Sequence, residues 1–345
     1  MSPGPLLGAI QDRLAARSRW HVLEIAFWLA ALASVVLLPG KHLILTEIAI
    51  LALFALSLDL ILGYAGIISL GHAAFFGFGA YVAGLLAKHG IINEPLLALL
   101  ASGFAAMLLG FVTSFLVLRG SDLTRIMVTL GVALVLREIA NRYAGLTGGA
   151  DGLQGVEVRP LLGLWRFDMF GHTAYAYALG VLFVMFLLAR RIVNSPFGLS
   201  LQSIKGNPLR AAAVGIPVNR RLVAVYTIAA GYAGVAGALL TQTTAFASLD
   251  VFAFDRSADL LLVLIIGGTG YLYGGLIGAI LFKLMQDYVS GLTPQYWPFW
   301  IGLLLVVIVL VGRERIGSWT APVRALVARL DWRTPPRPSS PEARS

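Results

Sequence analysis

The sequence predicts an all-α membrane protein that crosses the bilayer several times. Hydrophobic residues make up 58% of its 345 residues and charged residues only 12%, too few to cover the surface of a soluble protein of this length. The mean hydropathy of +0.84 agrees with that composition. Apolar runs of about 20 residues, the length that crosses a bilayer as a helix, recur along the chain. These observations exclude an ordinary soluble globular protein.

Eight segments have the length and apolar character of full transmembrane helices, namely residues 20–38, 43–62, 71–88, 96–118, 123–142, 173–190, 222–245 and 297–312. The first follows a basic start without a small-residue cleavage site, so we expect it to be kept as a helix and not removed as a signal peptide. The chain then divides into a cytoplasmic N-terminal segment (1–19), a transmembrane domain (20–312) and a basic, partly disordered cytoplasmic tail (313–345).

The distribution of positive charge predicts the orientation in the membrane. Short loops rich in Lys and Arg stay in the cytoplasm. Loop 194–221 and the C-terminal tail are both basic, so both termini are expected inside and loop 143–172 outside. Segment 257–291 must then enter and leave the membrane on the same side. Its two apolar stretches flank the glycine-rich residues 267–275, which predicts a broken helical hairpin packed against protein or lining a cavity.

Charge and residue counts also limit the partners and cofactors. A net charge of +9 would favour nucleic acid in a soluble chain, but here orientation and anionic lipid headgroups explain the cations. The bilayer is therefore the expected surface partner, and no nucleic acid is expected. Cysteine is absent and the five histidines are scattered, so no metal site is predicted. The glycine cluster at 267–275 lacks the Gly-Lys-Ser/Thr of a phosphate loop, so any ATP would bind another subunit.

Loop 194–221 contains a short predicted helix over residues 208–214. Asn207 suits the N-cap and Pro208 the first helical position, while Gly215 followed by proline forms a stop. The helix either lies on the bilayer surface or docks a cytoplasmic partner that pushes on the membrane domain. On the second interpretation the docking residues are Lys205, Asn207, Pro208, Leu209, Arg210, Ala212, Ala213 and Gly215.

The glycine-rich stretch 63–81 carries the densest pattern of the chain. Its small residues either let helices pack closely or break the helix near Gly63 and Gly71, which would free backbone groups to face a pathway across the membrane. The polar run 241–244 either lines the outer part of that pathway or caps a helix. The candidate pathway residues are Gly63, Tyr64, Gly66, Ser69, His72, Phe75, Phe76, Gln242, Gly267, Gly268 and Gly270. No catalytic residue is predicted.

Taken whole, stretch 63–81 resembles the signature of branched-chain amino-acid ABC transporter permeases of the LivM type, a family for hydrophobic amino acids and amides. Further motifs resemble that family in the same order between residues 43 and 289: Thr129-Leu130 with Arg137, the loop 146–152, Ser195-Pro196-Phe197-Gly198, 211–216, 231–238, and 266–270 with Gly274. Two departures stand out. Ile67 occupies a position where the family often has Gln, and Ala212 one where its ATPase-docking motif usually carries Glu.

The resemblance implies a permease subunit of an ATP-binding-cassette importer in the bacterial inner membrane, without enzyme activity of its own. It implies a second homologous permease subunit, two cytoplasmic ATPase subunits that carry ATP and Mg, and a periplasmic substrate-binding protein. The apolar residues Ile67, Phe75 and Phe76 favour branched-chain or other hydrophobic amino acids as substrate. Urea, short amides and aromatic acids remain open.

Two other classes of function compete with this expectation. An ion-coupled secondary transporter or channel would need carboxylates near the middle of the membrane. Asp59 and Asp259 are the candidates, and both lie near predicted helix ends. A membrane-embedded enzyme would need a metal cluster or a nucleophile with its base, and the sequence shows neither pattern.

Overall fold

The computed structural model describes residues 22–168, 170–292, 294–296, 299–300, 302–303 and 306. The predicted N-terminal segment and C-terminal tail lie outside the described residues, as does most of the last predicted span, 297–312. The chain divides into two units, Met1–Met285 and Gln286–Ser345, and the helical bundle belongs to the first.

The described part of the chain is helical and contains no strand beyond two isolated bridges, which confirms the all-α prediction. The α-helices are α2 (Val22–Leu37), α3 (His42–Leu62), α4 (Ala73–Lys88), α5 (Pro95–Val117), α6 (Asp122–Arg142), α7 (Ala144–Thr147), α8 (His172–Val193), α9 (Pro196–Gly206), α10 (Pro208–Ala213), α11 (Val218–Thr244), α12 (Phe254–Gly267) and α13 (Leu272–Leu292). Two 3₁₀ turns, η1 (Gly149–Asp151) and η2 (Leu249–Phe252), lie in the connections.

Seven of the eight predicted spans coincide with a helix. Within the described residues, α3, α5, α8 and α11 are long and apolar enough to cross a membrane, and the bent pair α12–α13 makes a fifth candidate. Helices α2 and α4 are apolar but have only 16 residues each. Helix α6 has 21 residues but carries charges in its first and last turns. A polytopic helical membrane protein is therefore confirmed, while the number of eight full spans stays a prediction.

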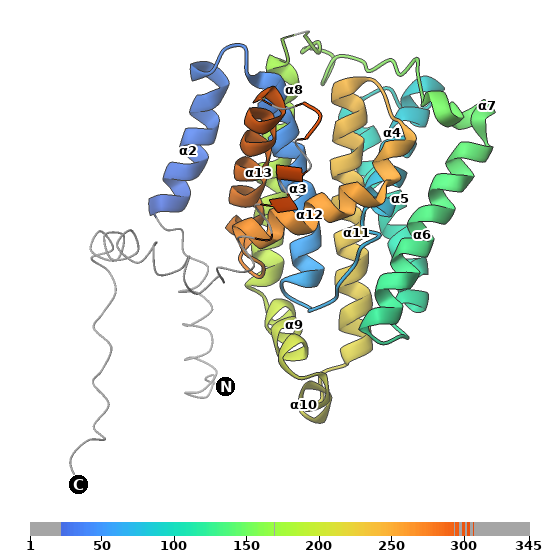
Figure 1. Ribbon diagram of the computed structural model, residues 1–345, viewed down its shortest axis with the longest axis vertical. Helices are drawn as coiled ribbons and strands as arrows, with labels where there is room; N and C mark the ends of the chain where they lie inside the picture. The colour runs from blue at the N-terminus through green and yellow to red at the C-terminus, as the bar shows by residue number, and fades with distance from the viewer. Residues whose placement is uncertain are drawn as a thin grey trace, which may run out of the picture. The chain divides into compact units, whose positions relative to one another are not determined.

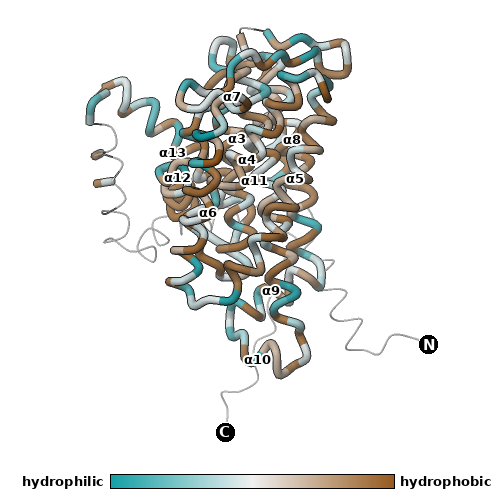
Figure 2. The backbone as a smooth tube through the Cα atoms, turned by 90° about the vertical axis from the view of Figure 1, so that its right-hand side faces the viewer, coloured by the Kyte–Doolittle hydropathy of each residue, from teal (hydrophilic) through white to brown (hydrophobic). Residues whose placement is uncertain are grey.

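Helix α11 forms the centre of the bundle. It packs against α3, α4 and α5. In both α3 and α11, 78% of the 18-residue apolar segment that could cross the membrane is buried inside the protein. On α5, by contrast, Phe104, Leu108 and Leu116 point outward with more than half of their surface exposed. In Figure 2 the hydrophobic residues of the outer helices, α5 among them, are brown along the middle of the bundle, and the hydrophilic segments lie mainly toward its ends. Such an apolar exterior suits lipid and not water.

Small residues allow the central helices to touch backbone to backbone. A Cβ added to Gly79 of α4 would overlap the backbone of Gly234 on α11, and one added to Gly237 would overlap the carbonyl oxygen of Phe76. Close approach of this kind replaces the hydrophobic effect as the source of helix association inside a bilayer. The packing interpretation of the Gly-rich stretch therefore holds for Gly79.

Replacing Gly79 by alanine is expected to destabilise the protein, because the new methyl group has no space against Gly234. Overpacking of this kind costs about 1–3 kcal/mol, which a lower thermal unfolding midpoint of the detergent-solubilised protein would reveal. Gly180→Ala on α8 is the matched control, since nothing lies within 4 Å of its added Cβ. Equal midpoints for the two variants would contradict the tight α4–α11 contact.

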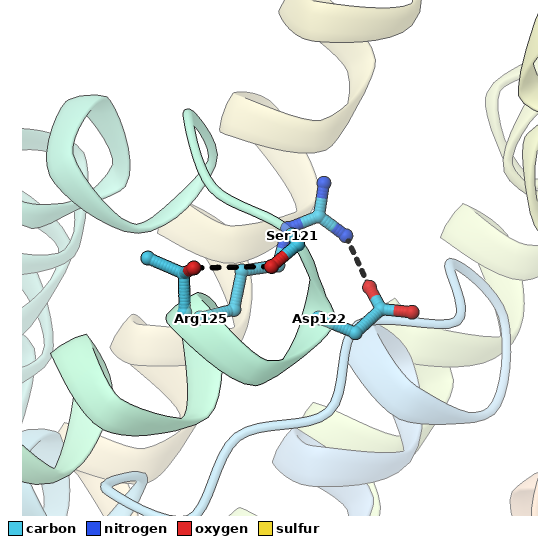
Figure 3. A network of polar contacts seen from close by, with 4 residues as sticks. Ser121, Asp122 and Arg125 are labelled. Carbon is cyan, nitrogen blue, oxygen red and sulfur yellow. Dashed lines mark hydrogen bonds and ion pairs between the residues drawn. The ribbon is translucent and has the colours of Figure 1, made fainter.

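The two ends of the bundle differ in structure. Helices α9 and α10 project from one end, and α7 with the loop that follows it lies at the other (Figure 1). The connection from α5 to α6 carries a small polar network, in which Arg125 pairs with Asp122 at 3.0 Å and the hydroxyls of Ser121 and Thr124 lie 3.0 Å apart (Figure 3). These bonds join side chains to one another, and the Ser121 side chain does not cap the start of α6.

Candidate translocation and coupling site

Helix α10 forms where the sequence places it. The side chain of Asn207 accepts a hydrogen bond from the backbone N–H of Arg210 at 3.0 Å, and Pro208 begins the helix. The helix ends at Ala213, one residue before the predicted end. Gly215 follows with φ +89°, a left-handed conformation that favours glycine, and its N–H donates to the carbonyl of Ala212 at 2.9 Å. The predicted cap and stop are both confirmed.

The outer face of α10 is an exposed, largely apolar tip. We call Leu209, Arg210, Ala212, Ala213 and Val214 the docking tip. All five are exposed, with Leu209 82% and Val214 83% accessible, whereas Ala211 is buried. Exposed large apolar side chains at the end of a protruding helix are typical of a surface that another protein covers. Val214 is not among the predicted docking residues, although its position at the predicted end of the helix is a signal that could have identified it as one.

Lys205 of α9 lies apart from the docking tip and turns toward the membrane domain. Its Nζ donates a hydrogen bond to the carbonyl oxygen of Gly63 at 2.6 Å. Its side chain also covers Gly66, where an added Cβ would lie 3.1 Å from Lys205 Cγ. The structure thus links α9 to the segment that follows α3, across 142 positions of sequence.

The helix is broken between α3 and α4, as one interpretation of the glycine-rich stretch predicts. Residues 63–72 are not helical, and Gly66 takes φ +74°. The N–H of Ile67 donates to the carbonyl of Ile61 at 2.9 Å, which folds the chain back after the break. Tyr64 and Ile67 are buried. Non-helical backbone within a membrane domain is stable here because protein surrounds it.

Polar and aromatic side chains surround the start of α4. Nε2 of His72 lies 2.9 Å from the hydroxyl of Ser57 on α3, and the N–H of Ala73 donates to the hydroxyl of Ser257 on α12 at 3.0 Å. The buried Nδ1 of His72 and hydroxyl of Ser69 have no hydrogen-bond partner among the described residues. Unsatisfied buried polar groups often mark a functional site. Ser57 and Ser257 were not among the predicted site residues, although each is a lone hydroxyl beside an apolar run.

Three predicted aromatic candidates occupy the same buried region. Phe76 packs on Phe54 with ring centroids 4.5 Å apart, and Phe75 lies edge-on to His72 at 5.7 Å. Tyr64 is buried in the break. The structure therefore brings the candidates between 63 and 76 together around one broken segment.

The predicted break between two helices is present, while their entry and exit on the same side of the membrane stays a prediction. Helices α12 and α13 are bent by 111° at a short break that contains Gly268 and Gly270, both with positive φ. The N–H of Gly270 donates to Oδ1 of Asp59, a fully buried carboxylate of α3, at 2.7 Å. We call Asp59, Gly63, Lys205 and Gly270 the junction. It joins α9, the end of α3 and the hairpin turn, and Asp59 supplies a contact that the pathway prediction did not include.

Gln242 is not brought together with the other candidates. Its Oε1 accepts a hydrogen bond from the hydroxyl of Tyr177 at 2.9 Å, and its Nε2 donates to the carbonyl of Pro95 at 2.8 Å. These contacts tie α11, α8 and α5 at the end of the bundle opposite α9 and α10. The amide therefore has a packing role in this structure.

Membrane orientation can be tested with single cysteines, because the chain has none of its own. Ser203→Cys on α9 is expected to react with a membrane-impermeant maleimide only after the membrane is opened to expose the cytoplasmic side. Gln154→Cys, in the loop predicted to lie outside, is expected to react with the same reagent in intact cells. Both residues are exposed in the structure, so access from one side decides the labelling. Reaction of both variants from the same side would overturn the predicted topology.

The comparisons with known proteins agree with this architecture. The sequence model of the family described as "Branched-chain amino acid transport system / permease component" matches residues 42–311. The high-affinity branched-chain amino acid permease protein LivM of Salmonella typhimurium is 26% identical over 307 residues, which covers 82% of this chain and 71% of that protein. LivM of Escherichia coli is 26% identical over 304 residues, with 81% and 70% covered.

Relatives with other names match as well. The ribose import permease protein RbsC of Bacillus subtilis is 27% identical over 291 residues, covering 79% of this chain and 84% of that protein. No solved structure matches the chain significantly. The family match spans most of the chain and the apolar helices fit a multi-pass protein of the inner membrane, so the chain belongs to the family of branched-chain amino acid transport system permease components.

Proposed function

We propose that this permease is one membrane-spanning subunit of an ATP-binding-cassette importer for branched-chain or other hydrophobic amino acids. Its partners are a second homologous permease subunit, two cytoplasmic ATPase subunits that bind ATP and Mg, and a periplasmic substrate-binding protein. The observation that carries the proposal is the exposed docking tip, connected through Lys205 to the buried helix break. An autonomous channel has no use for such a connection.

The proposed mechanism follows from the junction. Closure of the ATPases on ATP would move α10 and, with it, α9. Lys205 would carry that movement to Gly63, and the bond between Asp59 and Gly270 would carry it to the α12–α13 turn. Packed helices of this kind switch between discrete arrangements, and the partner's different contacts with each arrangement supply the driving free energy.

The substrate class rests on two supports. The LivM relatives are named for branched-chain amino acids, and Ile67, Phe75 and Phe76 make the surroundings of the break apolar. Other relatives are named for ribose and fructose, so sugars are the main competitors, with amides and aromatic acids behind them. The family's substrates differ more than its fold does.

Co-purification tests the assembly. The chain is tagged, extracted gently from native membranes and analysed by mass spectrometry. Recovery of two ATPases and a second permease supports the importer. Recovery of the chain alone, together with uptake driven by an ion gradient in proteoliposomes, would favour an ion-coupled secondary transporter instead.

A competition assay tests the substrate. Uptake of labelled leucine by cells that express the complete transporter is measured in the presence of excess valine, ribose, urea or phenylalanine. Strong competition by valine and none by ribose is the expected pattern. The reverse pattern would keep the importer but discard the amino-acid assignment.

A further inference from the structure

A groove runs between the inner ends of α5 and α11, outside the candidate translocation site. Its volume is about 870 Å³. On one side it is lined by Phe111 and Phe115 of α5 and by Arg119 in the turn that follows the helix, and on the antiparallel α11 by Arg220, Ala224 and Ile228. Residues with spacings of three to four lie on one face of a helix. Each side of the groove therefore has an apolar stripe that leads to an arginine.

Packing explains why the groove occupies only one end of this helix pair. Farther along, small residues bring the helices into contact: a Cβ on Gly110 would overlap that of Ala230, and one on Gly103 would lie 2.7 Å from Val235. Toward Arg119 and Arg220 neither helix has another glycine, and Phe111, Phe115 and Val223 line the groove beside the smaller Ser114 and Ala224. The groove lies at the end that bears α9 and α10, which the basic loop predicts to be cytoplasmic.

The two arginines at the groove's mouth carry uncompensated positive charge. Arg119 and Arg220 are exposed and form no ion pair with any residue that the structure describes. The neighbouring Arg125, in contrast, is already paired with Asp122 (Figure 3). Arg221, next in the chain, lies over the ring of Phe197 at 5.3 Å. Charge at the mouth of the groove is therefore available for an anion.

We infer that this groove binds an anionic phospholipid of the inner leaflet. Guanidinium groups bind phosphate through several donors at once, and basic pockets between helices at the cytoplasmic surface suit anionic headgroups. The helical part of the stripe, from Phe111 to the end of α5 at Val117, is about 9 Å long at 1.5 Å per residue, enough for the first part of an acyl chain. Thr227 lines the same groove, and its buried hydroxyl has no hydrogen-bond partner among the described residues.

The inference goes beyond the proposed transport function and depends on it only for the inward orientation. A soluble phosphate would bind the arginines but would not contact the apolar stripes. A zwitterionic lipid would contact the stripes, but its neutral headgroup would be held less strongly by the arginines. Only an anionic lipid satisfies both parts of the groove.

Native mass spectrometry of the purified transporter in detergent tests this assignment. The probes are phosphatidylglycerol and phosphatidylcholine with identical acyl chains. Phosphatidylglycerol is expected to bind more tightly, and the double variant Arg119→Gln/Arg220→Gln to bind it about 30-fold more weakly, at roughly a fivefold loss per arginine. Arg191→Gln is the matched control, because Arg191 is an exposed arginine at the cytoplasmic end of α8 that does not line the groove.

Three results would overturn the inference. The first is equal phosphatidylglycerol binding by the double variant and the unsubstituted protein. The second is displacement of the lipid by millimolar inorganic phosphate, which would indicate a soluble-anion site. The third is efficient cross-linking of Val223→Cys, then the sole cysteine of the chain, to the second permease subunit. That would make the groove part of a subunit interface.

Discussion

Uptake is expected to fall to background when Gly215 is replaced by proline, although the protein still inserts in the membrane. Gly215 has φ +89°, whereas proline fixes φ near −65° and removes the N–H that bonds Ala212. The substitution would therefore remove the stop of α10 and turn the docking tip away from its partner. Because Gly215 is exposed and far from the core, the helices of the bundle should fold normally.

The matched control for this variant is Gly215→Asn. Asparagine tolerates the left-handed conformation and keeps the N–H, so uptake should stay within about twofold of the unsubstituted level. Two substitutions of the tip itself, Leu209→Glu and Arg210→Glu, should also abolish uptake by placing unfavourable charge on the docking surface. Uptake, the amount of protein in the membrane and recovery of the ATPases are measured together. Normal ATPase recovery and uptake by Gly215→Pro would discard the docking role of α10.

The second large effect is expected at Asp59. Asp59→Leu removes the acceptor of the Gly270 N–H inside the protein, and a buried donor without a partner costs about 1–3 kcal/mol. An energy of that size shifts a two-state equilibrium by about 5–150-fold. We therefore expect uptake per molecule to fall by roughly tenfold, even where the ATPases still assemble with the permease.

Asp59→Asn separates coupling from simple destabilisation. The amide keeps one oxygen that can accept from Gly270, so it should restore most of the uptake that Asp59→Leu loses. The informative measurement is the ratio of substrate imported to ATP hydrolysed, because a defect in the junction lowers this ratio while a defect in folding lowers only the amount of complex. An unchanged ratio in Asp59→Leu would remove Asp59 from the proposed mechanism. If Asp59 instead coupled an ion gradient, uptake would respond to that gradient.

Several local features followed from the sequence with little error. The boundaries of α10 were predicted within one residue because Asn207, Pro208 and Gly215 act on their own backbone and its nearest neighbours. The breaks after Gly63 and at Gly268 followed from glycine in otherwise apolar runs. The number of full spans was harder to predict, since α4 is shortened by the break that precedes it.

Contacts between distant residues could not be predicted in this way. Nothing near Lys205 in the sequence indicates that its ammonium group bonds Gly63, 142 positions away, and Asp59 and Gly270 are separated by 211. For Gln242, the sequence left a pathway role and a helix-capping role equally open, and the bonds to Tyr177 and Pro95 favour a third role, packing between helices.

The sequence by itself determined the membrane class, the helical segments, the docking helix and the two breaks, because composition, periodicity and capping act over a few residues. Only the tertiary structure decided which of these elements meet. It placed the α9 lysine on the first break, the α12–α13 turn on a buried carboxylate, and Arg119, just after α5, in one groove with Arg220 of α11. Contacts between such distant elements depend on how whole helices pack, and small residues far apart in the chain determine that packing.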